Sequence, residues 1–172
     1  MVVPDGESVA ARPTVKHPPK VNVWAGVAYN GRTKPYLFEQ NLDRMLYVKI
    51  LRERIPADTP AIFSRGQWTF QQDGDPKHTS KLAQKWLADH VPHFIPKSDW
   101  PPNSPDLNCI EPVWSLVQDE VYRREPRTVA GLRRIIAEEW RKIPQDTIRS
   151  LVDSMPHRLA AVIRAKGGHT KY

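Results

Sequence analysis

The sequence predicts a mixed α/β domain that ends in a basic helical tail, and three observations carry this prediction. Asn30-Gly31 lies between two β-rich runs, which is a strong hairpin signal. From Asp43 onward, apolar residues recur at helical spacing in several segments. The 172 residues are 40% hydrophobic and 26% charged, close to globular averages, so we expect one domain with its own core.

The first elements are a hairpin and a helix. The expected strands and the turn between them are Val21–Ala28, Asn30-Gly31 and Lys34–Phe38. The helix is expected from Asp43, with Asn41 or Asp43 as N-cap and Pro56 as its end. Residues 1–20 form an irregular lead-in to these elements.

The middle of the chain predicts alternating strands and helices. A short strand is expected over Gln67–Gln72, and it ends directly at Asp73. Helical spacing of apolar residues follows over Ser80–His90, and His93–Ile95 is a second short strand. The prolines within residues 96–109 make that segment stiff and non-helical.

The remaining residues predict three helices. The first begins at Ile110 and places Pro112 in its first turn, where proline is tolerated. The second is capped by Thr128. The third runs from Pro144 through Val162. We therefore divide the chain into the lead-in 1–20, a core 21–125 and a basic helical part 126–172.

The positive charge is concentrated at the C-terminal end. The formal net charge is +7, yet residues 1–120 hold 14 basic and 14 acidic side chains, whereas residues 121–172 hold 12 basic and five acidic ones. Such a field suits a polyanion, most commonly a phosphate backbone. A solvated helix face would have the same composition, and charge alone does not separate the two interpretations.

Composition also excludes several classes of protein. No apolar run approaches the roughly 18 residues of a membrane-spanning helix, so no membrane partner is expected. The first residues lack a basic and apolar secretory pattern, so we expect an intracellular chain. The single cysteine, Cys109, can form no internal disulfide. One cysteine is also too few for a cysteine-based zinc site, so we expect neither.

Two acidic residues stand at the ends of predicted elements. Asp73 follows a strand and Glu111 begins a helix, so a sheet edge and a helix terminus can bring two carboxylates together across a cleft. Such hard oxygen ligands suit Mg²⁺ or Mn²⁺. The alternative is that Asp73 only forms the turn before Gly74 and Glu111 only complements the helix dipole. We expect Asp75 to be a turn residue and Asp106 to brace the proline-rich loop or cap the helix.

The two segments around these acids resemble a known family. FQQDGDPKHTS, starting at Phe70, and DWPPNSPDLNCIEPVW, starting at Asp99, strongly resemble the catalytic core of Tc1/mariner transposases. The resemblance runs from about VNVWAGVAYNG, starting at Val21, to near Tyr122, and the basic tail is also typical. It implies an RNase H-like fold, in which helices flank a mixed sheet.

The resemblance also implies an activity and its residues. Such enzymes use two aspartates and a third acid on two divalent cations to cleave DNA at transposon ends and join it to target DNA. Asp73 corresponds to the second aspartate and Glu111 to the third acid, both as catalytic residues and as ligands of Mg²⁺ or Mn²⁺. His78 is expected to support them. The basic side chains expected to contact DNA are Lys77, Lys81, Arg123, Arg124, Arg133 and Arg134.

One part of the family pattern has no counterpart in the sequence. The first catalytic aspartate should lie on a strand upstream of the hairpin, and no such segment is present. Asp5, in PDGES, is the nearest replacement, although this stretch looks more like the one that follows the first strand in relatives. Without that strand, we expect Val21–Ala28 and Gln67–Gln72 to lose a shared neighbour and leave backbone groups unpaired. The helix-turn-helix module that finds transposon ends is also not expected from these residues.

Three hypotheses follow. The first is the catalytic core of a DNA transposase that performs strand cleavage and transfer. The second is a catalytically inactive truncated or domesticated remnant that only binds DNA. The third is an RNase H-like nuclease of other specificity. The sequence leaves open a homodimer, and a nuclear location follows only from the DNA substrate in a eukaryote-like family.

Overall fold

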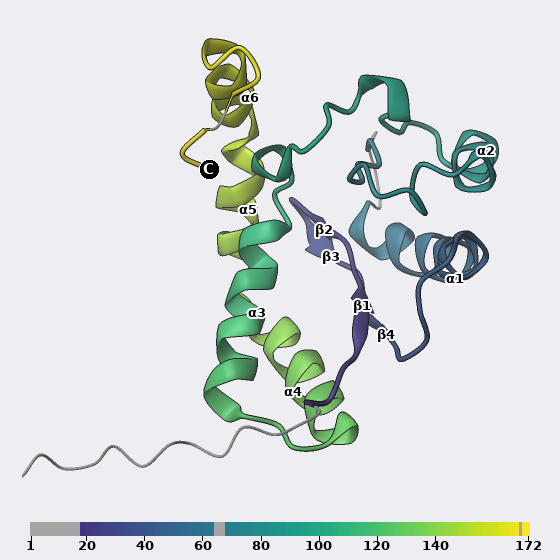
Figure 1. The fold of residues 1–172 in the computed structure, drawn as a ribbon. Helices are drawn as coiled ribbons and strands as arrows, with labels where there is room; N and C mark the ends of the chain where they lie inside the picture. Colours follow the sequence, from purple (N-terminus) through teal and green to yellow (C-terminus); the bar gives the residue numbers. More distant parts are fainter. Residues whose placement is uncertain (1–17, 64–67, 169) are drawn as a thin grey trace, which may run out of the picture.

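A small antiparallel β-structure lies between two groups of helices (Figure 1). The computed structural model describes residues 18–63, 68–168 and 170–172. The helices on one side are α1 (Arg44–Ile62) and α2 (Lys81–His90). Those on the other side are α3 (Glu111–Arg124), α4 (Val129–Lys142) and α5 (Gln145–Asp153), followed by α6 (Met155–Arg164). This confirms the mixed α/β class with a helical C-terminal part, and no described helix is long and apolar enough to cross a membrane.

The hairpin is present, with its turn one residue earlier than expected. The strands are β1 (Asn22–Trp24), β2 (Val27–Ala28), β3 (Gly31–Arg32) and β4 (Tyr36–Phe38). β1 pairs with β4 and β2 with β3, both antiparallel. Because Ala28 pairs with Gly31, the two turn residues are Tyr29 and Asn30 rather than Asn30 and Gly31. Asn30 has no positive φ, so the turn does not use the left-handed geometry that Asn-Gly favours.

The expected strand Val21–Ala28 is divided into β1 and β2, whereas Lys34–Phe38 is shortened to β4 and β3 precedes it, outside both expected strands. Trp24 pairs with Tyr36 and Val27 with Arg32, so residues 25–26 face the longer segment 33–35. The Thr33 amide donates to the Gly26 carbonyl at 2.9 Å, and the Gly26 amide donates to Thr33 Oγ1 at 2.8 Å. The side-chain hydroxyl thus replaces a ladder hydrogen bond, and the extra residue forms a bulge.

The alternation of side chains along the hairpin creates a core on each face. Trp24 packs with α1 and α2, whereas Val23 packs with α3, α4 and α5. The buried members of the first core are Tyr47, Val48, Leu51, Ile55, Ala83, Trp86, Leu87 and Val91. Those of the second are Val113, Val117, Leu132, Ile136, Trp140, Ile143 and Ile148. The period of two places neighbouring residues of one strand in different cores, which fixes the hairpin between the helical layers.

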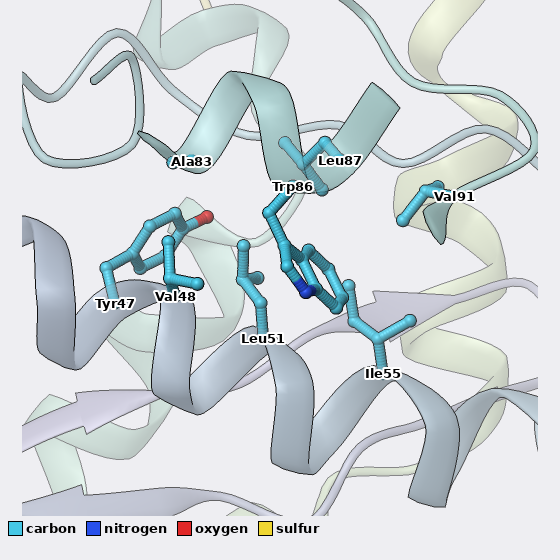
Figure 2. Close-up of a cluster of buried hydrophobic side chains, with 8 residues drawn as sticks. All are labelled: Tyr47, Val48, Leu51, Ile55, Ala83, Trp86, Leu87 and Val91. Carbon is cyan, nitrogen blue, oxygen red and sulfur yellow. The ribbon is translucent and has the colours of Figure 1, made fainter. Parts of the chain in front are cut away.

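The contact between α1 and α2 is made by large apolar side chains. Figure 2 shows Leu51 and Ile55 of α1 facing Trp86 and Leu87 of α2. Leu51 and Leu87 are fully buried. Asp43 caps α1 by accepting from the Leu46 amide at 2.8 Å, as expected.

Helix α1 does not end at Pro56, which corrects the sequence prediction. It continues through Pro56 and Pro60 to Ile62. A proline removes the bond to the carbonyl four residues earlier, which here belongs to Arg52 for Pro56. Arg52, Pro56 and Pro60 are all exposed, so water can hydrate the unpaired carbonyls and the helix tolerates both prolines.

The two short strands expected in the middle of the chain are reduced to one bridge. Phe70 and Phe94 form an isolated parallel bridge, in which the Phe70 amide donates to His93 O at 2.8 Å and the Ile95 amide to Phe70 O at 3.0 Å. Gln67 lies outside the described residues. The prediction of strands over Gln67–Gln72 and His93–Ile95 is therefore wrong in extent, because within the described residues each pairs only at this bridge.

The last predicted helix is two helices. α5 ends at Asp153 and α6 begins at Met155, with Pro156 in its first turn. Pro156 has no amide to donate to the Val152 carbonyl, so a single continuous helix would lack that bond. Thr128 caps α4 as expected, by accepting from the Gly131 amide at 3.0 Å.

Replacement of Leu51 by alanine should destabilise the domain. Leu51 is fully buried between α1 and α2, so the cavity and lost burial are expected to lower the free energy of unfolding by about 2–5 kcal/mol. Chemical denaturation monitored by circular dichroism measures this. Met45→Ala on the same helix is the control, because Met45 is 63% exposed and should change stability little. Equal losses in the two variants would contradict the described packing.

Candidate active site

Asp73 is positioned by two glutamines that precede it. Gln71 Nε2 donates to the Leu107 carbonyl at 2.9 Å, which ties this segment to the proline-rich loop. Gln72 accepts from the Tyr47 hydroxyl of α1 and donates through Nε2 to the His78 carbonyl at 2.9 Å. Sequence reasoning treated both as strand residues and missed these roles. Two consecutive amides at the end of an otherwise aromatic strand were the available signal.

Asp73 forms a closed hydrogen-bonded turn with the residues that follow. Its Oδ1 accepts from the Asp75 amide at 3.0 Å and lies 2.5 Å from His78 Nδ1. The hydrogen bond from His78 is the main reason why the pKa of Asp73 is lowered, against the opposing effect of burial. The His78 ring packs against the Tyr47 ring at a tilt of 33°, with centroids 4.2 Å apart. His78 therefore holds the carboxylate ionised and oriented.

Asp75 behaves as the expected turn residue. Its Oδ1 accepts from the Lys77 amide at 2.7 Å, and its Oδ2 lies 3.1 Å from Lys77 Nζ. Both carboxylate oxygens are therefore used within the turn.

Glu111 reaches the same site from the start of helix α3. It is the first residue of α3, and its Oε1 accepts from Asn108 Nδ2 at 3.3 Å. Burial raises the pKa of Glu111, and the negative charge of Asp73 raises it further. Asp73, Asn108, Glu111 and Trp100 line one cavity of about 440 Å³. The structure thus brings together the two acids that the sequence singled out.

The donors in this cavity fit a hard divalent cation in kind. They are carboxylate oxygens from two separate elements, and their mutual repulsion would be relieved by a positive ion between them. Within the described residues, no group of three or more His, Cys, Asp or Glu side chains is arranged to hold a metal. The acidic side chains that line the cavity are Asp73, Asp75 and Glu111, and both carboxylate oxygens of Asp75 are already engaged within the turn.

A second, larger cavity adjoins the acids. Its volume is about 560 Å³, and it lies between the hairpin residues 23–29, the segment 68–73, α1 and the start of α3. These are the two segments that we expected to flank a missing central strand. β1 has β4 as its only partner among the described strands. Asp5, the nearest replacement for the first aspartate, lies outside the described residues.

The basic candidates divide into two groups by position. Lys77 and Lys81 lie beside the acidic turn, at the start of α2. Arg123 and Arg124 end α3, about 20 Å from Glu111 at the other end of this 14-residue helix. Arg133 and Arg134 lie on α4, which packs against α3. None of these four arginines lines either cavity that borders the acids.

Three of these arginines are also engaged in ion pairs. Arg123 pairs with Glu120 at 2.5 Å. Arg124 contacts Glu138 at 3.1 Å and Glu139 at 2.8 Å. Arg133 lies 3.4 Å from Glu39. The Arg123 pair lies within α3, whereas the Arg124 contacts join α3 to α4 and the Arg133 contact joins α4 to the residue after β4, a structural use that the charge count did not indicate.

Replacement of His78 by alanine should raise the pKa of Asp73 toward its ordinary value. At present the lowered pKa means that Asp73 contributes stability above its ordinary pKa of 3.8, and this is lost as pH falls through the lowered value. Without His78 this contribution should become smaller, because only the Asp75 amide and the Lys77 charge then remain to lower the pKa of Asp73. A carboxyl NMR titration of Asp73 measures the shift. His90→Ala is the control, because His90 stacks on Trp86, and an unchanged Asp73 titration in His78→Ala would contradict the assigned contact.

Comparison with known proteins places the chain in a family. The family model described as DDE superfamily endonuclease matches residues 1–133. Over 169 residues the chain is 36% identical to the transposable element Tc1 transposase of Caenorhabditis elegans, covering 93% of this chain and 58% of that protein. It is 35% identical over 160 residues to the Tcb2 transposase of Caenorhabditis briggsae, covering 92% and 57% respectively. The chain therefore spans less than two thirds of the length of these relatives.

Solved structures agree on the fold. The catalytic domain of Mos1 mariner transposase superposes with a TM-score of 0.78 at 13% identity, covering 92% of this chain and 80% of that one. The same catalytic domain with Raltegravir and Mn superposes with a TM-score of 0.76 at 14% identity, covering 89% and 78%. The expected RNase H-like fold is thereby confirmed. The matched family model and the shared sequence together establish that this chain belongs to the DDE superfamily endonucleases and is homologous to the Tc1/mariner transposases.

Proposed function

We propose that this chain is the catalytic core of a Tc1/mariner-type transposase, which cleaves DNA strands and joins them to target DNA. The observation that carries the proposal is that Asp73 and Glu111, from separate elements, line one cavity. Family membership supports it, because the two acids lie in the two segments that resemble the family's catalytic blocks. The relatives named as transposases are longer than this chain, so the proposal concerns the catalytic step rather than recognition of transposon ends.

The residues divide the work as follows. Asp73 and Glu111 hold Mg²⁺ or Mn²⁺, with two ions expected in a complete site. When bound, these cations would activate the attacking oxygen and stabilise the leaving oxygen of a phosphodiester. His78 keeps Asp73 ionised at low pH and fixes its orientation through the 2.5 Å contact. Asn108 orients Glu111 by donating to Oε1. Each acid thus has a neighbouring side chain that orients its carboxylate, as expected for a site that binds a cation.

A further acid is part of the proposal. The cavity of about 560 Å³ between residues 23–29 and 68–73 is bordered by both Asp73 and Glu111. An additional strand in this space would gain backbone partners on the hairpin and on the segment 68–73, and an aspartate on it would complete a three-acid site. The match of the DDE family model supports this arrangement.

DNA is the proposed partner. Solved relatives include Mos1 in a paired-end complex with the left transposon end and in a strand transfer complex. In this chain, Lys77 and Lys81 are the basic residues next to the acids, so we propose that they contact the phosphates nearest the reaction. Arg123 and Arg124 at the end of α3, with Arg133 and Arg134 on α4, would contact DNA further along. A nuclear location is proposed on the same basis, because the substrate is chromosomal DNA.

Replacement of either acid should remove metal-dependent cleavage. Asp73→Asn or Glu111→Gln is expected to lower the rate by at least about 100-fold, since even residues that only support metal ligands cost 10–100-fold. The assay follows nicking of supercoiled plasmid with Mg²⁺ by the chain fused behind the N-terminal part of the Tc1 transposase, which supplies the upstream segments.

The matched control is Asp99→Asn. Asp99 is an exposed acid in the proline-rich segment, so its loss should leave nicking unchanged. Unchanged cleavage by Asp73→Asn in the active fusion would sink the proposed function. Salt-sensitive DNA binding without any nicking by the unaltered fusion would instead favour the remnant that only binds DNA.

Replacement of Lys81 should weaken DNA binding in a salt-dependent way. Lys81 has no ion pair among the described residues, so each DNA contact it makes would release about one counterion. Lys81→Ala is expected to reduce the slope of log K against log salt by about 1. Fluorescence anisotropy at several salt concentrations measures this. Lys85→Ala on the same helix is the control, because Lys85 already pairs with Asp89 at 2.9 Å. Equal slopes for Lys81→Ala and the unaltered chain would remove Lys81 from the interface.

A further inference from the structure

Arg158 is a buried charged residue that no catalytic role above uses. It lies on α6 and is 5% exposed. Its Nε donates to Ser154 Oγ at 2.8 Å, and its Nη1 donates to the Asp106 carbonyl at 2.9 Å. Its guanidinium also lies 4.8 Å from the centre of the Tyr172 ring. Within the described residues it forms no ion pair. A buried charge is costly unless it is hydrogen-bonded, so Arg158 depends on its bonds to Ser154 and to the Asp106 carbonyl. These bonds hold the Asp106 carbonyl in a defined place.

Asp106, whose carbonyl accepts from Arg158, forms a second hydrogen bond with the C-terminal part of the chain. Thr170 Oγ1 donates to Asp106 Oδ2 at 2.9 Å. Asp106 belongs to the 3₁₀ turn Pro105–Leu107, against which α6 packs. Asp106 is thus held through both its carbonyl and its carboxylate, which agrees with the expectation that it braces the loop.

The same turn connects the two acids. The Leu107 carbonyl accepts from Gln71, two residues before Asp73. Asn108, the next residue along the chain, donates to Glu111. A displacement of residues 105–108 would therefore act on the segment of Asp73 and on Glu111 together. Leu107 is 4% exposed, so the turn is also anchored in apolar surroundings.

From these contacts we propose that Arg158 is a positioning residue, which fixes the separation of Asp73 and Glu111 by holding the turn Pro105–Leu107 from α6. Thr170 assists it through Asp106. Arg158 does not touch the reacting groups; it acts through the loop. The consequence for metal binding rests on the proposed function, whereas the ordering of the loop does not.

The test measures loop order and metal binding separately in the 172-residue chain. Hydrogen exchange of the backbone amides over residues 104–111 reports loop order, and electron paramagnetic resonance of unbound Mn²⁺ reports metal affinity. Arg158→Ala should speed exchange over these residues and raise the Kd for Mn²⁺ by about 10-fold or more, the usual effect of losing a support behind a metal ligand. Arg158→Lys keeps the charge and one donor, and should restore part of the affinity.

Two further variants keep the inference testable. Thr170→Val removes only the hydroxyl that donates to Asp106, and should change both measurements in the same direction even if Arg158→Ala does not fold. Arg149→Ala is the matched control. Arg149 forms an ion pair within its own helix, 2.8 Å from Asp146, and lies 5.7 Å from the centre of the Tyr29 ring, and among the described residues it does not bond to the loop.

The outcomes separate this inference from the proposed function. Equal exchange and equal Mn²⁺ affinity in Arg158→Ala and Arg149→Ala would overturn it, as would faster exchange with unchanged affinity. Failure of the unaltered chain to bind Mn²⁺ would count against the proposed metal site, and the exchange data alone would then decide whether Arg158 orders the loop.

Discussion

One hydrogen bond joins the two halves of the candidate site. Gln71 Nε2 donates to the Leu107 carbonyl, 36 positions away, and so links the segment that carries Asp73 to the loop that leads into Glu111. The two acids belong to segments that pack against different cores, one on each face of the hairpin. Without a contact between those segments, their spacing would depend on two separately packed layers. The hydrogen bond from the Gln71 side chain to the Leu107 carbonyl instead fixes the spacing of the two segments directly at the site.

The polar residues around this bond are satisfied by one another. Gln72 bonds both Tyr47 and His78, His78 bonds Asp73, and Asn108 bonds Glu111. Partly buried amides are costly when unpaired, so this network both pays for its own burial and restricts the side chains to one arrangement. The pKa shifts of the two acids are opposite in sign: the hydrogen bond from His78 lowers the pKa of Asp73, while burial and the charge of Asp73 raise that of Glu111. An anionic pair of this kind is prepared for a cation.

Local signals in the sequence predicted the elements well where local chemistry decides them. Asp43 and Thr128 cap helices as expected, and the hairpin forms around Tyr29 and Asn30, one residue from the predicted turn. The failures have a common cause. Pro56 does not end α1, because Arg52, whose carbonyl it leaves unpaired, is exposed. Gln67–Gln72 pairs at only one described bridge, because strand length depends on neighbours. Neither solvent exposure nor strand partners can be deduced from local spacing.

The sequence by itself determined the chemistry of the site: Asp73 and Glu111 stand at element ends, in two segments that identify the family. Tertiary structure alone decided how that chemistry is held. Gln71 looked like a strand residue and Arg158 like part of a basic surface, yet one bridges the acid-bearing segments and the other is buried behind their loop. Likewise Arg124 was expected at DNA, and it joins α3 to α4 through Glu138 and Glu139. The physical reason is that a residue's type limits which bonds it can make, whereas its partners come from distant parts of the chain that only folding brings within reach.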